Sequence, residues 1–214
     1  MPGYGQMLET AERCRRLPGL ERVDSPDAAA LTFDDGPDPD GTPAMLDALD
    51  AAGLKATFFV VGEQLMRHHA IAREAIARGH ELALHGFAHI EHDTLSPSQA
   101  RDDVARAIGT FEAGTGRRPR FFRPPYGRFS EHSHAACHDL GLEPVYWSAW
   151  GMDWEDLAAD RIADLVRRDL VPGAIVLLHD SVRYGHRPSV RATAEAVGLI
   201  AEADLTFRPL GELV

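Results

Sequence analysis

The sequence comprises 214 residues, with 22 Lys or Arg, 33 Asp or Glu and 11 His, and its formal net charge at pH 7 is −11. This acidic balance disfavours nucleic acid and anionic membranes as partners, because both require a basic protein face. A hydrophobic content of 44% is typical of a globular chain and argues against disorder. The length suits a single domain.

Neither the cysteines nor the N-terminal segment indicates a disulfide framework, a metal site or a targeting signal. Cys14 and Cys137 form neither a disulfide framework nor a CxxC metal pair, so we expect inert thiols. The segment from Met1 to Pro18 lacks the apolar core of a signal peptide, and no apolar run approaches the ~20 residues of a membrane span. The sequence therefore predicts a cytoplasmic protein without membrane insertion, and it leaves the oligomeric state open.

Apolar runs rich in β-branched or aromatic residues alternate with helical patterns along the chain. We expect strands at Ala29–Phe33, Ala56–Val61, Glu81–Leu84, Arg120–Phe122, Pro144–Trp147, Ala174–Leu178 and Leu205–Phe207. We expect helices at Thr42–Ala52, Ser98–Thr115, Asp160–Asp169 and Val190–Ala203. This alternation predicts an α/β fold with about seven parallel strands and outer helices, in a closed or nearly closed barrel over residues 28–214. Residues 1–27 are expected to form a helix and loop extension packed on the outside.

Polar residues of the kinds used in catalysis follow five of the expected strands. Because the carboxyl ends of barrel strands open onto one face, these residues are expected to share one active site. They are Asp34 and Asp35, His85 and His89, Arg123, Asp153 and Trp154, and His179 and Asp180.

Two adjacent carboxylates, Asp34 and Asp35, end the first strand. Such a pair is costly unless a cation or hydrogen bonds compensate the charge. Neighbouring strand side chains point in opposite directions, so the chain must bend at Gly36-Pro37 if both carboxylates serve one site. A solvated turn is the alternative interpretation, because Asp, Gly and Pro are ordinary turn residues.

Histidines His85 and His89 have the i, i+4 spacing that places two side chains on one face of a helical turn. Two imidazoles and one carboxylate leave an open coordination position on Zn²⁺ or a similar divalent ion. Asp35 is the favoured carboxylate, and His92 is an alternative third ligand. His80 precedes its strand and is interpreted as structural.

Two further strand ends carry an arginine and a histidine. Prolines fix the backbone after Arg123, a permanent cation that could hold a carboxylate ionised. A salt bridge on a rigid loop is the alternative role. His179 ends a buried apolar strand and suits general acid chemistry, although a buried structural histidine would look the same.

Five short motifs in this order resemble the polysaccharide deacetylase superfamily, carbohydrate esterase family four, over about residues 28–214. The matching segments are Thr32-Phe-Asp-Asp-Gly-Pro37, His85-Gly-Phe-Ala-His89, Arg123-Pro-Pro-Tyr-Gly127, Asp153-Trp154 and Leu177-Leu-His179. The resemblance implies a distorted (β/α) barrel.

The resemblance also implies a role for each matching residue. The implied catalytic residues are Asp34 as base, Arg123 to orient it, His179 as general acid and Asp153 to tune that acid. The implied metal ligands, usually for zinc, are Asp35, His85 and His89. The implied substrate contacts are the backbone N–H of Tyr126, for the oxyanion, and an acetyl pocket made by Trp154 and Leu177.

Three positions depart from the motifs of the family. Gly86 replaces the usual Ser or Thr, so we expect one loop-stabilising hydrogen bond to be missing. Ser130 stands where the third motif often ends in Asn, and Trp150 occupies the place of an Asp in the fourth. The aromatic residues around Trp150 are expected either to reshape the substrate cleft or to pack in the core.

The implied function is metal-dependent hydrolysis of the N-acetyl group of an amino sugar or of an N-acetylglucosamine-containing oligosaccharide or polysaccharide, with release of acetate. The implied cofactor is a divalent metal, usually Zn²⁺, with Co²⁺ or another ion as an option. Hydrolysis of a non-carbohydrate amide or cyclic imide on the same fold is the alternative. A barrel that only binds sugar is a third option, disfavoured because binding alone needs no paired base and acid.

Overall fold

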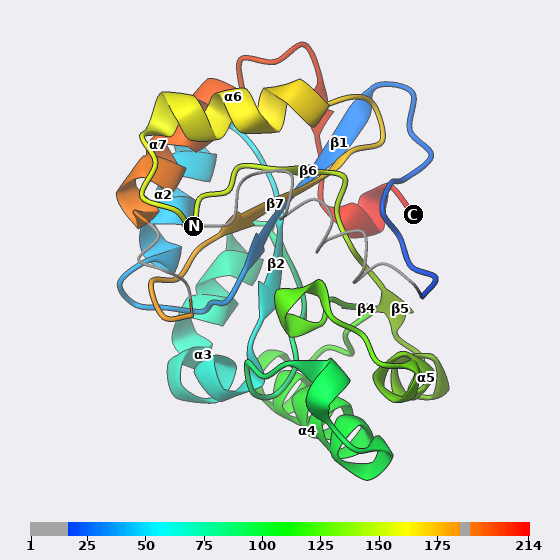
Figure 1. The fold of residues 1–214 in the computed structure, drawn as a ribbon. Helices are drawn as coiled ribbons and strands as arrows, with labels where there is room; N and C mark the ends of the chain where they lie inside the picture. The colour runs from blue at the N-terminus through cyan, green and yellow to red at the C-terminus, as the bar shows by residue number, and fades with distance from the viewer. Residues whose placement is uncertain (1–16, 185–188) are drawn as a thin grey trace.

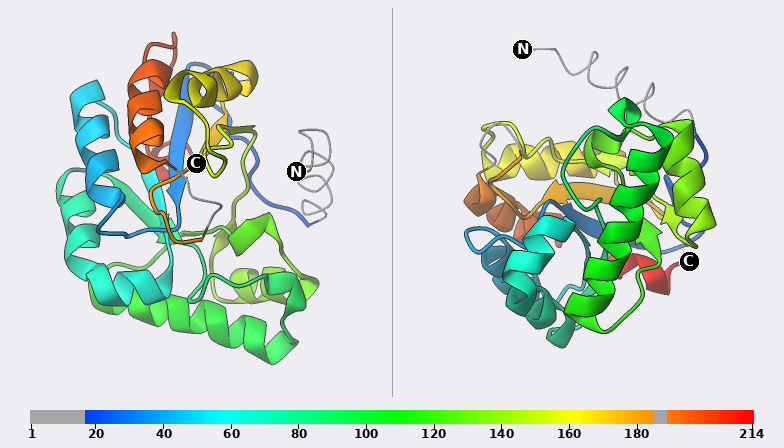
Figure 2. Two further views of the ribbon diagram at one scale, coloured as in Figure 1. Left: turned by 60° about the vertical axis from the view of Figure 1, so that its left-hand side comes forward. Right: turned by 90° about the horizontal axis from the view of Figure 1, so that it is seen from below.

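A curled sheet of parallel strands forms the centre of the molecule, and helices surround it (Figures 1 and 2). The computed structural model describes residues 17–184 and 189–214. Its strands lie in the order β5-β4-β3-β2-β1-β7-β6, and β8 pairs with β1. The strands are β1 Ala28–Asp34, β2 Thr57–Val60, β3 Glu81–Leu84, β4 Phe121–Phe122, β5 Glu143–Pro144, β6 Ala149–Trp150, β7 Ile175–His179 and β8 Thr206–Phe207.

In the described part of the chain six helices cover the outer surface of the sheet, each packed on its neighbours. They are α2 Thr42–Ala52, α3 Gly62–Ala77, α4 Pro97–Thr115, α5 Glu131–Asp139, α6 Ala159–Asp169 and α7 Val190–Ile200. Local signals fix the ends of α4: Ser96 forms a capping box with Gln99, and Gly116 ends the helix in the left-handed conformation. Short 3-10 turns follow at His92–Thr94, Pro125–Gly127 and Leu210–Glu212. This architecture confirms the distorted (β/α) barrel predicted from the sequence.

Strand β1 is buried along its whole length and determines where the carboxyl ends of its neighbours fall. Its pairing with β7 sets Asp34 directly beside His179, and its pairing with β2 sets Asp34 beside Phe59. Because the strands are parallel, the residues that follow them collect at one end of the barrel.

The segment before β1 fills the opening between the two ends of the sheet. Within the described residues β5 and β6 are not paired, so the barrel is open there. Leu20 bridges to Val145 beside β5, and Arg22 bridges to Ala174 beside β7. Residues 17–27 are thus part of the barrel wall, whereas the expected helix of the extension, with Cys14, lies outside the described residues. Cys137 is a free, buried thiol.

Two helices and one strand of the structure were not expected from the sequence. Helix α3 buries mainly small side chains, and α5 buries only Ser133, Ala136 and Cys137, so neither presents a strong apolar stripe. Of the expected strand at 144–147 only Pro144 lies in a strand, β5, and the additional strand β6 follows it. No helix in residues 17–184 or 189–214 is both long and apolar enough to cross a membrane.

Candidate active site

Both carboxylates at the end of β1 face the same histidine. Asp34 Oδ2 lies 3.8 Å from His85 Nε2, and Asp35 Oδ1 lies 3.5 Å from the same atom. Strand alternation is broken at Asp35 itself, which has a φ of 86°. The bend therefore comes one residue before the expected Gly36-Pro37 turn, whose peptide bond is cis.

Asp35, His85 and His89 form a candidate metal centre. Their ligand atoms all lie within 4.8 Å of one another, and His89 Nε2 is 3.1 Å from Asp35 Oδ1. His85 Nδ1 donates to the carbonyl of Arg123 at 2.8 Å, which leaves the lone pair of Nε2 directed at the cluster. Asp35 Oδ1 is buried and has no hydrogen-bond partner among the described residues. A carboxylate and two neutral imidazoles in this arrangement fit a divalent cation.

The electrostatics of this cluster favour an ionised carboxylate. Burial by itself would raise the pKa of Asp35, but the adjacent His85 and His89 hold this pKa well below its usual range. Asp35 is thus a permanent anion at neutral pH, as a metal ligand must be.

The candidate ligands His85 and His89 do not lie on a helical turn, contrary to the expectation from their spacing. His85 follows directly on β3, and residues 86–88 form an irregular bend in which Gly86 has a φ of 80°. His92, the alternative third ligand, points elsewhere, with Nε2 at 3.2 Å from Asp103 Oδ2. His80 is structural as expected: its Nδ1 accepts a hydrogen bond from the backbone of Ala56, and burial lowers its pKa to about 4.

Arg123 holds the first carboxylate of the pair. Its Nη1 donates to Asp34 Oδ1 at 2.6 Å and to the Thr32 hydroxyl at 2.9 Å. Its Nη2 donates to the carbonyl of Tyr146, and its guanidinium stacks over the Phe59 ring. Burial lowers the pKa of Arg123, against the attraction of Asp34, yet an arginine stays charged at any pH of interest. The pair leaves Asp34 Oδ2 free to face His85.

His179, at the end of β7 beside Asp34, forms a second pair with Asp153. His179 Nδ1 donates to Asp153 Oδ1 at 2.9 Å, and the His179 backbone N–H donates to Asp153 Oδ2 at 2.7 Å. Burial opposes a charge on the imidazole, but the Asp153 carboxylate outweighs it and raises the pKa of His179 to about 10. Asp153 follows the unexpected strand β6 rather than β5.

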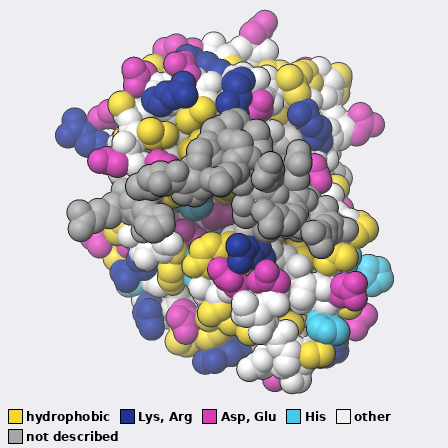
Figure 3. Space-filling model, viewed as in Figure 1, with side chains coloured by type: hydrophobic (Ala, Val, Ile, Leu, Met, Phe, Trp, Pro, Cys, Tyr) yellow, Lys and Arg dark blue, Asp and Glu magenta, His cyan; other side chains and the backbone are white. Residues whose placement is uncertain are grey.

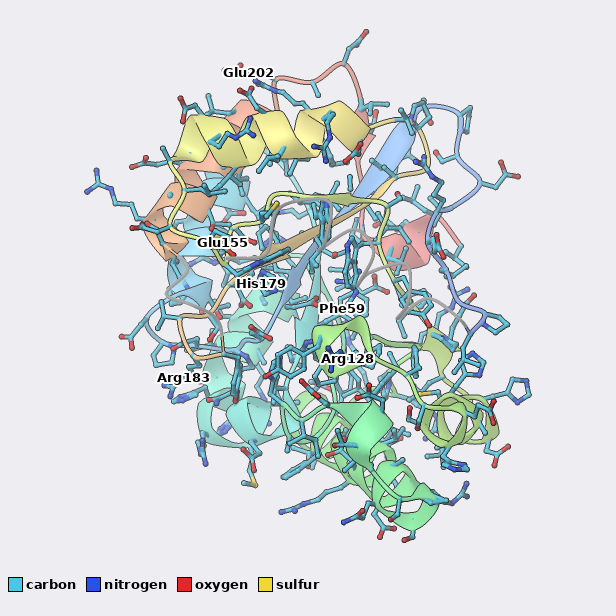
Figure 4. All side chains as sticks on the ribbon, in the orientation of Figure 1. Phe59, Arg128, Glu155, His179, Arg183 and Glu202 are labelled. Carbon is cyan, nitrogen blue, oxygen red and sulfur yellow. The ribbon has the colours of Figure 1, made fainter. Side chains whose placement is uncertain are left out.

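Aromatic and apolar side chains surround these pairs. The Trp154 ring lies edge-on to His179 with centroids 5.5 Å apart, and Leu177 precedes His179 by two residues on the same face of β7. Tyr126 has a φ of 60° and packs its ring edge-on against His89. All the residues expected at the site are thus brought to one end of the barrel. In Figure 4 His179 lies near the middle of the view, with Arg128 and Arg183 on opposite sides below it.

Two further side chains support the site: Asp180, which the sequence placed there without assigning it a role, and Tyr184, which the sequence did not indicate. Asp180 accepts hydrogen bonds from the Gly36 backbone and the Thr42 hydroxyl, and burial raises its pKa to about 7. Tyr184 stacks flat on His89, with ring centroids 4.3 Å apart, and its hydroxyl accepts a hydrogen bond from Gln64. The position of Asp180 directly after His179 was a usable signal, whereas nothing in the sequence places Tyr184 beside His89.

The three departures from the family motifs have structural explanations. Ser130 caps α5 by accepting a hydrogen bond from the Ser133 backbone. Trp150 is buried between Trp147 and Trp154, so the aromatic residues combine core packing with one wall beside His179. The loop that begins at Gly86 is bound by Asp103 of α4, which accepts hydrogen bonds from the Phe87 and Ala88 N–H groups.

The chain is thus a (β/α) barrel with a candidate hydrolytic centre at the carboxyl ends of its strands. The Arg123–Asp34 and His179–Asp153 pairs define this centre. The chain belongs to the polysaccharide deacetylase family, whose model matches residues 21–145. This match includes the segments of Asp34, His85 and Arg123, and the structure adds His179 beside them. The family expected from the sequence is thereby confirmed.

Three similar proteins illustrate the range of this family. A chitooligosaccharide deacetylase of Bradyrhizobium is 34% identical over 86% of this chain and 89% of that protein. A family 4 carbohydrate esterase from Streptomyces lividans, solved with acetate, is 30% identical, covers 83% of this chain and 88% of its own, and has a TM-score of 0.75. A family 4 pseudoenzyme from Bacillus anthracis shares the fold at 24% identity and a TM-score of 0.82, over 92% of this chain and 68% of its own.

Proposed function

We propose that this protein is a metal-dependent deacetylase that removes N-acetyl groups from N-acetylglucosamine-containing oligosaccharides or polysaccharides and releases acetate. The observation that carries the proposal is the position of Asp34, held by Arg123, and of His179, held by Asp153, beside the Asp35–His85–His89 cluster. A base and an acid next to a metal centre are what amide hydrolysis requires. A protein that only binds sugar would need neither.

The divalent ion, for which two imidazoles and one carboxylate favour Zn²⁺, would be held by Asp35, His85 and His89. When bound, it supplies Lewis acidity, which polarises the amide carbonyl and acidifies water. Asp34 is the general base. Arg123 occupies its Oδ1, so Oδ2 is the atom that takes the proton as water attacks the carbonyl carbon.

The remaining residues stabilise the charge and complete the reaction. The backbone N–H of Tyr126 would donate to the oxyanion as the tetrahedral intermediate forms. His179 then protonates the leaving nitrogen: its Nδ1 is held by Asp153, so Nε2 carries the proton that the amine receives. The C–N bond breaks, and the products are acetate and the free amino sugar. Trp154 and Leu177 would enclose the acetyl methyl group.

A neutral sugar substrate is consistent with the charge of the molecule. The net charge of −11 gives no attraction for polyanions, whereas the cationic amine of the product is compatible with an acidic protein. Acidic and basic side chains are interspersed over the described part of the face shown in Figure 3.

The test is acetate release from chitooligosaccharides, peptidoglycan fragments and a set of non-carbohydrate amides and cyclic imides, with Zn²⁺, Co²⁺ or a chelator present. We expect metal-dependent acetate release from the N-acetylated sugars. Turnover confined to the other amides would assign the alternative hydrolase. Metal binding with no turnover of any substrate would place the protein with the pseudoenzymes of the fold.

A further inference from the structure

The bend between the two histidines of the candidate metal centre is held by hydrogen bonds from two helices. On one side, the carbonyls of Gly86 and Phe87 accept hydrogen bonds from the backbone N–H groups of Gly62 and Glu63, each at 2.9 Å. These donors belong to the first turn of α3, where N–H groups have no partner within the helix. The carbonyl side of the bend is therefore fixed by α3.

The N–H groups of the same bend are bound by one carboxylate of α4. Asp103 Oδ2 accepts from the Phe87 N–H at 2.9 Å, and Asp103 Oδ1 accepts from the Ala88 N–H at 3.1 Å. The Asp103 side chain is only 8% exposed, and the fully buried His92 lies 3.2 Å from its Oδ2. A charged acceptor for two successive amides gives stronger and more directional bonds than a neutral one would.

Gly86, which directly follows His85, has no side chain that could support the bend. A Cβ atom at Gly86 would lie 3.0 Å from the Ala88 carbonyl and 3.2 Å from Asp103 Oδ2, at a φ of 80° that disfavours other residues. Arg106, one helical turn after Asp103, stacks its guanidinium 3.7 Å from the Phe87 ring centroid. Helix α4 thus holds the bend through Phe87 and Ala88.

We propose that Asp103 is a positioning residue of the metal centre, which acts through the Phe87 and Ala88 amides to fix the separation and direction of the His85 and His89 imidazoles. The inference rests on the proposed metal site and extends it to a residue outside the five motifs. His89 has no such support from its own side chain, since its Nδ1 finds no hydrogen-bond partner among the described residues. Apart from ring contacts with Tyr126 and Tyr184, its position therefore depends on the backbone that Asp103 holds.

The test compares Asp103→Asn with Asp102→Asn, a matched control on the exposed side of the same helix turn. Zn²⁺ affinity is measured by competition with a chromophoric chelator, and the visible spectrum of the Co²⁺ form reports ligand geometry. Circular dichroism and thermal unfolding of the metal-free proteins identify conditions under which each variant is folded. We expect Asp103→Asn to bind Zn²⁺ tenfold to a hundredfold more weakly, with an altered Co²⁺ spectrum, while Asp102→Asn matches the wild type.

If Asp103→Asn does not fold, Asp103→Glu decides the matter, because it keeps the charge and shifts the carboxylate by one methylene. A weaker affinity and a changed Co²⁺ spectrum in the folded Glu variant support the positioning role. Wild-type Zn²⁺ affinity and a wild-type Co²⁺ spectrum in folded Asp103→Asn would overturn the positioning role. If Asp103→Asn does not fold, the same result in Asp103→Glu would overturn it. Absence of metal binding by the wild type would instead overturn the proposed metal centre, and this inference with it.

Discussion

The Arg123 guanidinium and the Asp34 carboxylate form a buried ion pair at 2.6 Å, with Arg123 also bonded to the Thr32 hydroxyl and the Tyr146 carbonyl. A lysine carries the same charge but cannot make this planar set of bonds. We therefore expect Arg123→Lys to lower kcat at least tenfold and to destabilise the fold by about 1–3 kcal/mol, the cost of leaving buried polar partners unsatisfied. Steady-state kinetics and chemical denaturation measure the two effects. A variant with wild-type kcat would show that Arg123 is only structural.

Replacing the base should separate chemistry from metal binding. Asp34→Asn keeps the shape and the hydrogen bond to Arg123 but has no carboxylate to accept a proton. We expect kcat to fall by a factor of about 10²–10⁴, the usual contribution of a general base, with Zn²⁺ affinity within a few-fold of the wild type. Asp35→Asn is the matched comparison, because it should lose metal affinity as well. Equal kinetics for Asp34→Asn and wild type would remove Asp34 from the mechanism.

The His179–Asp153 pair predicts a shift in the pH profile. Asp153 raises the pKa of His179 to about 10, so Asp153→Asn should return it toward the ordinary value of about 6.5. Since the general acid must be protonated, the alkaline limb of the kcat profile should move to lower pH in the variant. An unchanged alkaline limb would contradict the role of Asp153.

The same pair makes a prediction for stability. A histidine whose pKa is raised by folding stabilises the native state fully below about pH 6.5, and this contribution is lost as the pH rises through about 10. The stability difference between wild type and Asp153→Asn should therefore shrink between these limits. Urea denaturation at a series of pH values measures it, and a constant difference would argue against the charged pair.

Asp180 should act in the same sense as His179, but at lower pH. Its pKa is raised by burial to about 7, so the native state holds a proton that the unfolded chain loses near pH 4. Stability should fall as the pH rises from about 4 to about 7, by up to about 1.4 kcal/mol for each unit of pH. Asp180→Asn keeps an acceptor for the Gly36 N–H and should remove this fall. A variant that retains the wild-type pH dependence would assign the titration to another group.

Tyr184 should influence substrate binding more than the chemical step. Its ring covers one side of His89, and its hydroxyl accepts from Gln64. We expect Tyr184→Ala to raise KM by about tenfold and to widen the range of sugars accepted, whereas Tyr184→Phe, which keeps the ring, should stay within about threefold of wild type. Equal KM values for both variants and the wild type would show that the ring does not border the substrate.

The sequence predicted most of the site because each reactive residue follows a strand that local patterns identify. Asp34, His85, Arg123 and His179 were placed together by the rule that parallel barrel strands end on one face. What local patterns could not supply was the backbone between them. The positive φ of Asp35 and the bend at Gly86 depend on tertiary contacts, and the expectation of a helical turn from His85 to His89 was wrong for that reason.

The supporting residues were harder to predict than the reactive ones. Asp103 lies in the middle of an amphipathic helix, where an acid is usually an ordinary solvated residue. Its partners are 15 and 16 residues away in the chain, and only the packing of α4 on the bend brings them together. The same holds for Leu20, whose strand-like pairing with Val145 has no signal in its local sequence.

The pairing of residues 20–23 with the opening of the sheet has a consequence for biosynthesis. This segment leaves the ribosome before every strand of the barrel, yet its partners are the backbones of Pro144, Tyr146 and Gly173. Residues 20–23 are thus made before the residues with which they pair. Until translation has passed Gly173, the sheet edges that this segment covers stay open, and open strand edges can pair with another chain.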